Sequence, residues 1–575
     1  MLELNDLSLF NGSGDNEQII LHEISAQFPD GHFTAILGPS VSGNSTLLRL
    51  IAGIGEASMG GVNWDDPAHG TDGASAPHAI GFIPQCDFTR DYLSVRESIE
   101  DALRLRVTGL DADDRQEQSD KILLEVGLVD VADQQARFLS PAQKARLKLG
   151  IELVNSPKVL LCDHIGSGLD PKAEHELLKL LRQISMERKC LTLLVTGNLR
   201  HLSLFNTLFV LHEGHLAYHG PGEFLFHYFN VENPEELFPR LSQRKAGEWH
   251  SSWAKHRTAY YSAQTDGYQV VKSSEEEPEE ALPGDKPEGD EDAPKKQASK
   301  KKKRAVAPGG SAFTQMMILL VQRWKALARN RTQLLLQLTF LLGLPCLVVV
   351  FGWQGLSKIV NPATSGSAEA AGTGALVSAL VMFQAILLTF AGAVNGAAEI
   401  AGERAILEKE KFAGLRPVSY IASKALFLLV LAAGQSLWMA FFVRGICHFP
   451  GDFLVQALTL FCVNAAMTAI CLGISALSSS PERAKLVALF IVAIQLPFSG
   501  TILALPAVLS RIARPLDTAY WGWSGVLRTF VGHYELGAGL KLFPVTICLC
   551  VLGTQILLGL CLALLGTKRN AWAKP

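Results

Sequence analysis

The spacing of apolar and charged residues divides the chain into two halves of different character. Residues 1–240 mix both kinds as globular domains do, whereas residues 311–575 consist mainly of long uncharged stretches. A helix needs about 20 apolar residues to cross a bilayer, and six stretches of suitable length contain no Asp, Glu, Lys, Arg or His. They are 334–352, 375–398, 425–443, 453–480, 486–510 and 542–567. We therefore predict an all-α, six-helix transmembrane domain over residues 311–575.

Charged residues between these stretches orient the predicted helices. Basic residues occur in 403–416 after the second stretch, in 482–485 after the fourth, and in the tail 568–574. Cytoplasmic loops are rich in Lys and Arg, so we place these segments in the cytoplasm. An even number of crossings then places both termini there as well. Three arginines within 511–528 fall on the outer side of the membrane in this arrangement. The first residues do not resemble a signal peptide. We expect a multi-pass integral protein of the plasma or inner membrane.

A shorter amphipathic segment precedes the first stretch, over residues 311–329. Its apolar positions recur at spacings of four and three: Phe313, Met317, Leu320, Trp324 and Leu327. The other face carries Gln315, Gln322, Arg323, Lys325 and Arg329. This pattern predicts a helix that lies in the membrane interface. The alternative is a soluble helix packed on a domain.

The two halves are joined by a linker, which we place at 241–310 and predict to be disordered from about residue 272. The stretch 275–292 holds ten acidic residues and one Lys, and seven Lys and Arg residues follow within 295–304. Such a segment buries too little apolar surface to fold. Its basic cluster either contacts anionic lipid head groups or pairs with the acidic run upstream. The ten cysteines of the chain are scattered without a C-x-x-C pair, so no disulfide framework or zinc site is indicated.

Residues 38–46 read GPSVSGNST and form a phosphate-binding loop in which the lysine is replaced by Asn44. An apolar strand over 33–37 precedes the loop, and an apolar helix over 47–52 follows it. In such loops backbone N–H groups at a helix N-terminus cradle the phosphates, and the lysine neutralises the β and γ charges. The scaffold of a nucleotide site is therefore present, while its dedicated cation is absent.

Further motifs follow in a fixed order. They are IGFIPQ at 80–85, LSVRES at 93–98, LSPAQ at 139–143, VLLCDH at 159–164, SGLDP at 167–171 and VTGN at 195–198. Together with the phosphate loop they resemble the Walker A, Q-loop, signature, Walker B, D-loop and switch motifs of an ATP-binding cassette (ABC) transporter half. The resemblance implies an α/β P-loop NTPase cassette over residues 1–240 and a dimer of two such halves.

The order of the halves, cassette first and six spans second, resembles the G subfamily of ABC transporters. AYHGP at 217–221 is similar to a motif that follows the cassette there, and 403–424 resembles the charged loop that couples the membrane half to the cassette. Charges within 403–416 recur three or four positions apart, which favours a short cytoplasmic helix resting on the cassette.

The resemblance also implies which residues bind MgATP. The nucleotide contacts would be Phe10, Gly38, Ser42, Gly43, Asn44, Ser45, Thr46, Gln85, Ser140, Ala142, Asp163 and Asp170. Mg²⁺ would be held by Ser45, Gln85 and Asp163. His164 occupies the place of the catalytic glutamate and Asn198 that of the switch histidine. A lone Phe after a first strand is also a common core residue, so Phe10 has that alternative.

These replacements weaken hydrolysis more than binding. The missing lysine removes a charge-assisted hydrogen bond worth about 1.5–3 kcal/mol, or roughly 10- to 100-fold in affinity. A missing general base costs about 10²–10⁴-fold in rate. The signature is less damaged, because Pro141 falls near a helix start, where proline is tolerated, and Ser140 keeps its hydroxyl. We expect ATP to bind and the chain alone not to hydrolyse it.

The spans carry amides but no charges, namely Gln337, Gln384, Gln435, Asn464, Gln495 and Gln555. Such amides form hydrogen bonds between helices or contact substrate, and we favour the first. The lack of charge argues against a proton-coupled carrier and for a hydrophobic or lipid-like substrate. The first functional hypothesis is an exporter half paired with a catalytically competent half. The alternatives are a pseudo-ATPase structural or regulatory subunit and an active homodimeric pump. Substrate, direction and partner stay open.

Overall fold

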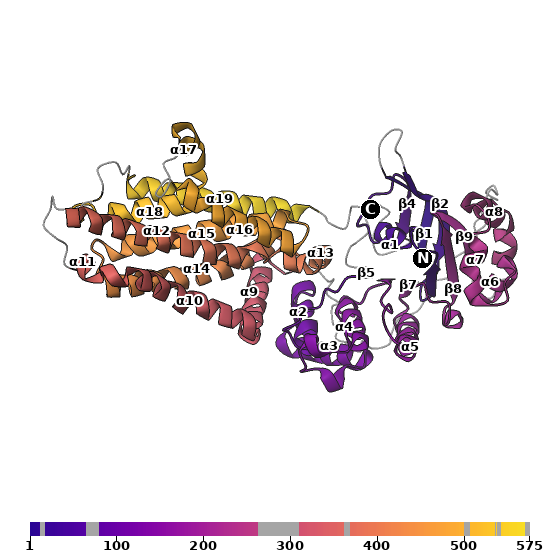
Figure 1. Ribbon diagram of the computed structural model, residues 1–575. Coiled ribbons are helices and arrows are strands. Elements are labelled where there is room, and N and C mark those ends of the chain that lie inside the picture. The colour runs from indigo at the N-terminus through magenta and orange to yellow at the C-terminus, as the bar shows by residue number, and fades with distance from the viewer. Residues whose placement is uncertain are drawn as a thin grey trace, which may run out of the picture. The chain divides into compact units, whose positions relative to one another are not determined.

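The computed structural model describes residues 1–11, 18–64, 80–262, 310–360, 368–499, 506–534, 536 and 542–569. It consists of two compact units (Figure 1). The first contains Met1–Leu47, Ala57–Gly73 and Leu181–Pro308, and the second contains Leu48–Glu56, Ala74–Leu180 and Gly309–Pro575. The disorder predicted from residue 272 lies outside the described residues. The predicted α/β half therefore contributes to both units, and all the membrane helices belong to the second.

Two groups of strands form the first unit. An antiparallel sheet has the order β2 (Gln18–Phe28), β1 (Leu2–Asn11) and β4 (Met59–Trp64). Four further strands lie side by side in the order β7, β3, β8, β9. Their bounds are Leu191–Val195, Phe33–Leu37, Thr207–His212 and His215–Gly220.

The second group carries the predicted nucleotide scaffold. Strand β3 is parallel to both β7 and β8 and is buried along its whole length, as strands covered on both faces are. The strand predicted over 33–37 is thus confirmed. Helix α1 (Asn44–Ile51) follows β3 after a six-residue loop, which confirms the strand–loop–helix order predicted from the sequence.

The first unit extends beyond residue 240, where we placed the start of the linker. Helices α6 (Gly222–Phe229), α7 (Leu237–Leu241) and α8 (Ala246–Ser262) follow β9. Trp249 and Trp253 of α8 are buried, and Trp253 packs on Tyr218 of β9 with 5.1 Å between ring centroids. The sequence boundary at 240 is therefore too early, because the two tryptophans of α8 belong to the folded unit.

The soluble part of the second unit is a helical layer beside two parallel strands. Strands β5 (Ile80–Ile83) and β6 (Val159–Asp163) pair directly. The helices are α2 (Val95–Arg106), α3 (Ala112–Glu125), α4 (Pro141–Leu153) and the beginning of α5 (Pro171–Arg188). Helices α2 and α4 each begin with a serine N-cap in a reciprocal capping box, which fixes where they start.

The membrane part of the second unit is all α-helical. Its principal helices are α9 (Ala312–Arg329), α10 (Arg331–Gly352), α12 (Ala368–Ala397), α13 (Arg404–Phe412), α14 (Pro417–Cys447), α15 (Phe453–Leu477), α16 (Pro481–Phe498), α18 (Thr518–Arg528) and α19 (Val545–Lys568). Within the described residues, five helical segments are long and apolar enough to cross a membrane. Helix α16 covers the predicted stretch 486–510 as far as Phe498, and 500–505 lie outside the described residues.

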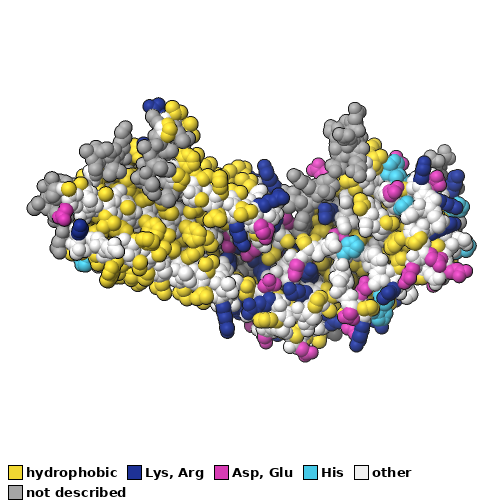
Figure 2. All heavy atoms as spheres, in the orientation of Figure 1, with side chains coloured by type: hydrophobic (Ala, Val, Ile, Leu, Met, Phe, Trp, Pro, Cys, Tyr) yellow, Lys and Arg dark blue, Asp and Glu magenta, His cyan; other side chains and the backbone are white. Residues whose placement is uncertain are grey.

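Small residues allow the membrane helices to pack closely. A Cβ atom on Gly559 of α19 would lie 2.4 Å from the backbone of Ala469 in α15, and one on Gly396 of α12 would lie 2.5 Å from the Thr468 carbonyl. Backbones approach this closely only where no side chain intervenes. Figure 2 shows many hydrophobic side chains on the visible face of these helices, as expected for helices in lipid.

Candidate functional site

The phosphate loop of the first unit runs from the end of β3 to the start of α1. Ser42 closes it, since its Oγ donates to the Pro39 carbonyl at 2.7 Å and its own carbonyl accepts from Gly214 N at 3.1 Å. A Cβ on Gly38 would lie 2.6 Å from the Leu211 carbonyl, so only glycine fits there. Gly43 has a φ of 92°, a conformation that favours glycine. The loop thus keeps a compact conformation held by its own backbone.

Asn44 lies at the first position of α1. Its side chain is 9 % exposed, and both amide atoms lie 3.0 Å from the place of a Gly38 Cβ. Its Oδ1 has no hydrogen-bond partner among the described residues. The amide is therefore folded back on the start of the loop. Ser45 and Thr46 follow in the first helical turn, both half-buried.

Val41 occupies the exposed tip of the phosphate loop with a φ of 70°. Its side chain is 96 % exposed, so no packing compensates for that backbone conformation. A β-branched residue in the left-handed region is an outlier that costs about 1–3 kcal/mol. A glycine would adopt this conformation without strain, so Val41 strains the tip of the loop.

Asn198 lies at the same edge of the first unit as the phosphate loop. Strands β3 and β7 are parallel neighbours, with Ile36 opposite Val195, so the segments at their carboxyl ends are adjacent. The Oδ1 of Asn198 accepts from Arg200 N at 3.0 Å, and its backbone N donates to Thr196 Oγ1 at 3.1 Å. Its carboxamide oxygen is thus engaged within its own turn. Phe10 is half-buried in β1, and its contact with adenine stays a prediction.

Gln85, Asp163 and His164 lie at one edge of the second unit. Strands β5 and β6 are parallel, with Ile83 opposite Cys162, so Asp163 at the end of β6 and Gln85 just after β5 lie at the carboxyl ends of adjacent strands. Asp163 is 2 % exposed and Gln85 is exposed. A carboxylate and an amide carbonyl are oxygen donors of the kind that Mg²⁺ prefers, so the residue types fit the ion. No group of three His, Cys, Asp or Glu suited to a metal occurs in the described part of the chain.

His164 has a φ of 52° directly after β6. Histidine is among the residues that tolerate this region, and the His164 carbonyl accepts from Ser167 N at 3.0 Å. Asp170 then caps α5, because its Oδ1 accepts from the backbone N of Lys172 and of Ala173, each at 3.0 Å. The D-loop is therefore a defined turn between β6 and α5.

The signature segment begins α4, as the position of Pro141 predicts. Ser140 is the N-cap, and its Oγ accepts from Gln143 N at 3.3 Å while Gln143 Oε1 accepts from Ser140 N at 2.9 Å. The hydroxyl proton of Ser140 stays available to a phosphate. The N–H of Ala142, in the first turn, has no partner within the helix.

A buried triad of charges joins α13 to the helical layer of the second unit. Glu152 of α4 accepts from Lys409 Nζ of α13 at 2.7 Å and from Arg106 Nη1 of α2 at 3.0 Å. The three side chains are at most 2 % exposed. Burial acts to raise the pKa of Glu152, but Lys409 and Arg106 outweigh it and hold the pKa below its ordinary value. The short helix predicted within 403–416 is confirmed.

Sequence analysis did not find this triad. Lys409 was one of several charges in a loop, and Glu152 lies 257 positions away, so no local spacing links them. The pairs that spacing did predict are present. Within α13, Glu408 bonds Lys411 at 2.9 Å and lies 3.5 Å from Arg404. Those pairs lie along the helix, whereas Lys409 reaches the neighbouring layer.

The polar face of α9 also contacts α2. Glu97 of α2 accepts from Lys325 at 2.9 Å and from Arg329 Nη2 at 3.0 Å, and Asp101 accepts from Gln322 at 2.9 Å. Burial acts to raise the pKa of Glu97, but hydrogen bonds from Arg329, the Ser94 N–H and Lys325 lower it to about 2. The predicted helix over 311–329 is confirmed, and its polar face packs on protein.

The apolar face of α9 is largely uncovered. Phe313 is 67 % exposed, Met317 39 % and Trp324 37 %, whereas Leu327 is buried. A helix that packs its polar side on protein and exposes aromatic and aliphatic side chains is suited to a membrane interface. The two predictions for this segment, a helix packed on a domain and a helix in the membrane interface, therefore fit opposite faces of the same helix.

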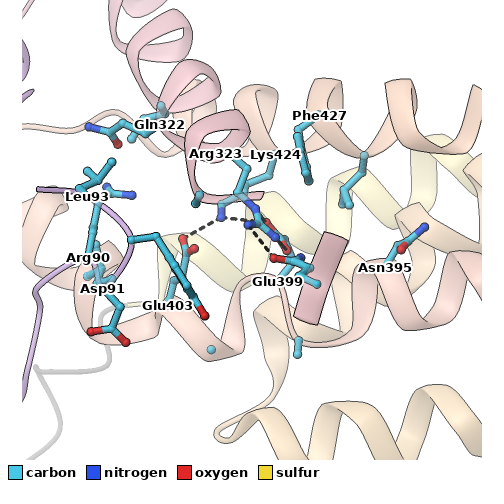
Figure 3. A pocket seen from close by; sticks show the side chains of 18 of the residues that line it. Arg90, Asp91, Leu93, Gln322, Arg323, Asn395, Glu399, Glu403, Lys424 and Phe427 are labelled. Atoms are coloured by element: carbon cyan, nitrogen blue, oxygen red, sulfur yellow. Dashed lines mark hydrogen bonds and ion pairs between the residues drawn. The ribbon is translucent and has the colours of Figure 1, made fainter. Parts of the chain in front are cut away.

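A pocket of about 520 Å³ lies where α9, α10, α12 and α14 meet the loop after β5 (Figure 3). Its floor is an ion-pair network. Arg323 bonds Glu399 through two contacts of 2.6 and 2.8 Å, and Lys424 bonds Glu399 at 2.9 Å and Glu403 at 2.7 Å. Apolar side chains of the membrane helices form the opposite wall, among them Leu336, Val394, Ala398, Phe427, Leu428 and Leu431.

The amides inside the spans bond between helices, as we favoured. Gln337 donates to Asn395 at 2.8 Å, Asn395 donates to Gln435 at 3.2 Å, and Gln435 donates back to Gln337 at 2.8 Å. Asn464 adds a bond to Gln435 at 3.1 Å. Gln555 bonds Thr518 at 3.1 Å. The ring satisfies polar groups that would otherwise be costly in hydrocarbon.

Comparison with known proteins accords with this architecture. A family model described as ABC transporter matches residues 21–165, and one described as ABC-2 type transporter matches residues 314–521. An ABC transporter ATP-binding/permease protein of Mycobacterium tuberculosis is 25 % identical over 88 % of this chain, which spans 54 % of that protein. ABC transporter G family member 22 of Arabidopsis thaliana is 26 % identical over 82 % of this chain, which spans 65 % of it.

A third relative matches the cassette alone. The methionine import ATP-binding protein MetN of Histophilus somni is 32 % identical over 42 % of this chain, and the match covers 75 % of MetN. The cassette implies ATP binding, and the apolar helices indicate an integral membrane protein. The chain therefore belongs to the ABC transporter family, with an ATP-binding cassette followed by an ABC-2 type membrane domain, consistent with a G-type half transporter.

Proposed function

We propose that this chain is the weakly ATP-binding half of an exporter for a hydrophobic or lipid-like substrate and that it works with a catalytically competent half. The observation that carries the proposal is the buried triad of Lys409, Glu152 and Arg106. A buried charge that loses its partner typically costs about 3–5 kcal/mol, so such a triad makes α13 and the helical layer move together. A transporter needs this connection, whereas a bare anchor does not.

MgATP would be held by the phosphate loop, with Mg²⁺ bound through Ser45, Gln85 and Asp163. Backbone N–H groups and the hydroxyl of Thr46 supply donors that do not depend on a lysine, and Ser42 would join them if its hydroxyl turned away from the Pro39 carbonyl. The second half would contribute its own motifs to a shared dimer. Both termini of this chain would be cytoplasmic, in a plasma or inner membrane, because the basic loops then lie inside.

A pseudo-ATPase subunit is the second candidate function, and the two catalytic positions favour it. Asn198 bonds within its own turn, and His164 replaces a carboxylate after β6. A subunit of this kind binds nucleotide and regulates or stabilises a complex, but its helix α13 does not drive transport.

Purification of the tagged full chain from its native membrane distinguishes the two. We expect a second ABC half with intact catalytic motifs to copurify. The pair reconstituted in vesicles should hydrolyse ATP and move a fluorescent phospholipid, while the chain alone gives background rates. Robust hydrolysis by the chain alone that collapses in His164→Ala would contradict the proposal and make His164 the base. If ATP hydrolysis by the pair stays fully coupled to transport in Lys409→Met, the result would favour the regulatory subunit.

A further inference from the structure

The pocket of Figure 3 contains more charged groups than its floor network uses. Seven charged side chains line it, three from the loop after β5 and four from the membrane part. Within the floor network, Glu399 bonds both Arg323 and Lys424, and Glu403 bonds Lys424. Two carboxylates and two cations thus neutralise one another there, so this group of four carries no net charge toward a ligand.

The loop after β5 supplies the other three charges, Asp87, Arg90 and Asp91. Asp87 lies 3.7 Å from both Lys144 and Lys148 of α4, and Asp91 lies 3.7 Å from Lys144. Both acids therefore have basic partners on α4. Within the described part of the chain, the Arg90 guanidinium makes no hydrogen bond and no direct ion pair, although its charge acts at longer range to lower the pKa of Glu403 and of Asp101. One cation is left over in the lining, and it is half-exposed.

A buried acceptor in the same lining is also unused. Gln322 of α9 is 4 % exposed, and its Nε2 donates to Asp101, but its Oε1 has no partner in the described structure. An unpaired buried acceptor costs about 1–3 kcal/mol. A ligand that brings a hydroxyl or ammonium donor to this atom would remove that cost. The pocket therefore offers Arg90 to bind an anion and Gln322 Oε1 to accept a hydrogen bond.

The other wall of the pocket is apolar and reaches the membrane-facing surface. Leu336 of α10 is 40 % exposed and Val394 of α12 is 39 % exposed, while Leu431 of α14 is half-buried between them and the floor. Hydrocarbon in contact with these side chains would be removed from water. A ligand that fits has a charged head and an apolar tail.

We propose that this pocket binds the phosphate-bearing head group of an anionic lipid from the cytoplasmic leaflet. The phosphodiester would pair with Arg90, a head-group hydroxyl would donate to Gln322 Oε1, and an acyl chain would lie along Leu336, Val394 and Leu431. The placement in the cytoplasmic leaflet rests on the proposed orientation of the helices. The site requires neither ATP binding nor hydrolysis.

Lipid binding to the full chain in detergent tests the proposal by native mass spectrometry. The probes are dioleoylphosphatidylglycerol, dioleoylphosphatidylcholine with the same chains, and glycerophosphoglycerol as a head group without chains. We expect one phosphatidylglycerol to bind at concentrations about tenfold below those for phosphatidylcholine. Glycerophosphoglycerol should not displace it at 100-fold excess, because it lacks the apolar contact.

Two arginine variants separate this site from a general attraction of anionic lipid to basic surfaces. Arg90→Gln should weaken phosphatidylglycerol binding about 10- to 100-fold, the range of a lost charge-assisted contact. Arg483→Gln removes the same charge from the exposed start of α16 and should change nothing. Arg90→Lys keeps the charge and should retain most of the binding, and it replaces Arg90→Gln if that variant does not fold.

Three results would overturn the proposal. Equal losses in Arg90→Gln and Arg483→Gln would mean diffuse surface attraction. Displacement by glycerophosphoglycerol at matching concentration would mean a small-anion site, and equal affinity for phosphatidylcholine would mean that negative charge is not recognised. Nucleotide titration of the same samples reports separately on the cassette, so failure of ATP binding does not mimic any of these results.

Discussion

Asn44 is short and is folded back on Gly38, so the phosphate loop would bind nucleotide with neutral donors only. Asn44→Lys should tighten MgATP binding about 10- to 100-fold, because a charge-assisted bond to phosphate is restored. Titration of the purified chain with a fluorescent ATP analogue measures this, and Asn198→His serves as a control that restores another family residue without adding a phosphate-loop cation. Undetectable binding in both wild type and Asn44→Lys would show that the loop itself cannot cradle phosphates.

Val41 offers a separate test of the loop backbone. Its φ of 70° suits glycine, and its side chain makes no compensating contacts because it is 96 % exposed. Val41→Gly should raise the unfolding temperature of the chain, by relief of about 1 kcal/mol of strain. Thermal unfolding in detergent measures it, with Phe138→Gly on the helical layer, where the side chain is 61 % exposed, as the control. A lower unfolding temperature in Val41→Gly would mean that the lost side chain matters more than the strain.

At this scale the sequence predicts positions well and side-chain conformations poorly. The position of Pro141 in its motif predicted a helix start, and α4 does begin at Pro141, because proline is tolerated where a helix leaves its backbone N–H groups free. The way in which Asn44 folds back depends on the space next to Gly38. No residue spacing encodes that.

Lys409 of α13 makes a buried contact with Glu152, and under the proposed function this contact passes motion between α13 and the helical layer. Lys409→Met leaves Arg106 as the one basic partner of Glu152 in the described part of the chain, and Arg106 also lies 3.7 Å from Glu410. Transport by the paired halves should therefore fall at least tenfold while nucleotide affinity is nearly unchanged. Lys411→Met is the matched control, since Lys411 pairs with Glu408 within the same helix. Transport and ATPase activity are measured on the same vesicles. Equal effects of the two substitutions would argue against a specific role for the triad.

Helices α2 and α9 are held together by Glu97, whose pKa of about 2 lies below the ordinary value of 4.5. A carboxyl with a lowered pKa in the folded state contributes stability that is complete above pH 4.5 and is lost as pH falls toward 2. The wild type should therefore unfold at a higher temperature than Glu97→Gln at pH 5 to 7. Thermal unfolding at intervals from pH 7 to pH 3 should show the difference shrinking only below pH 4.5. A constant difference over the whole range would contradict the ion pair.

The positions of the helices were easier to predict from the sequence than the surfaces against which they pack. The period of apolar residues identified α9 and the long apolar helices, because burial in lipid or protein imposes that period on the sequence. The partner of each face was not predictable. Sequence analysis left open whether α9 packs on a domain, and in the structure Lys325 and Arg329 contact Glu97, more than 200 positions away.

For the whole molecule, the dimer expected for such halves divides the catalytic work unevenly. In the family each ATP site combines the Walker motifs of one half with the signature of the other. A competent partner would therefore use the signature segment of this chain for its own ATP, and here the capping box at Ser140 is intact while His164 and Asn198 are altered. This chain would serve the partner's site better than its own.

That asymmetry predicts opposite sensitivities for two alanine substitutions in the paired complex. Ser140→Ala should lower ATP hydrolysis by the pair about tenfold or more, because a hydrogen bond to the partner's nucleotide is lost and the α4 cap is removed. Asn198→Ala should leave the rate nearly unchanged, because the site that contains Asn198 already lacks the lysine and the glutamate. Steady-state hydrolysis by the reconstituted pair measures both, and Ser140→Thr, which keeps a capping hydroxyl, controls for helix stability. If Asn198→Ala is the more damaging variant, the degenerate site is the working one, and this chain has a catalytic role of its own.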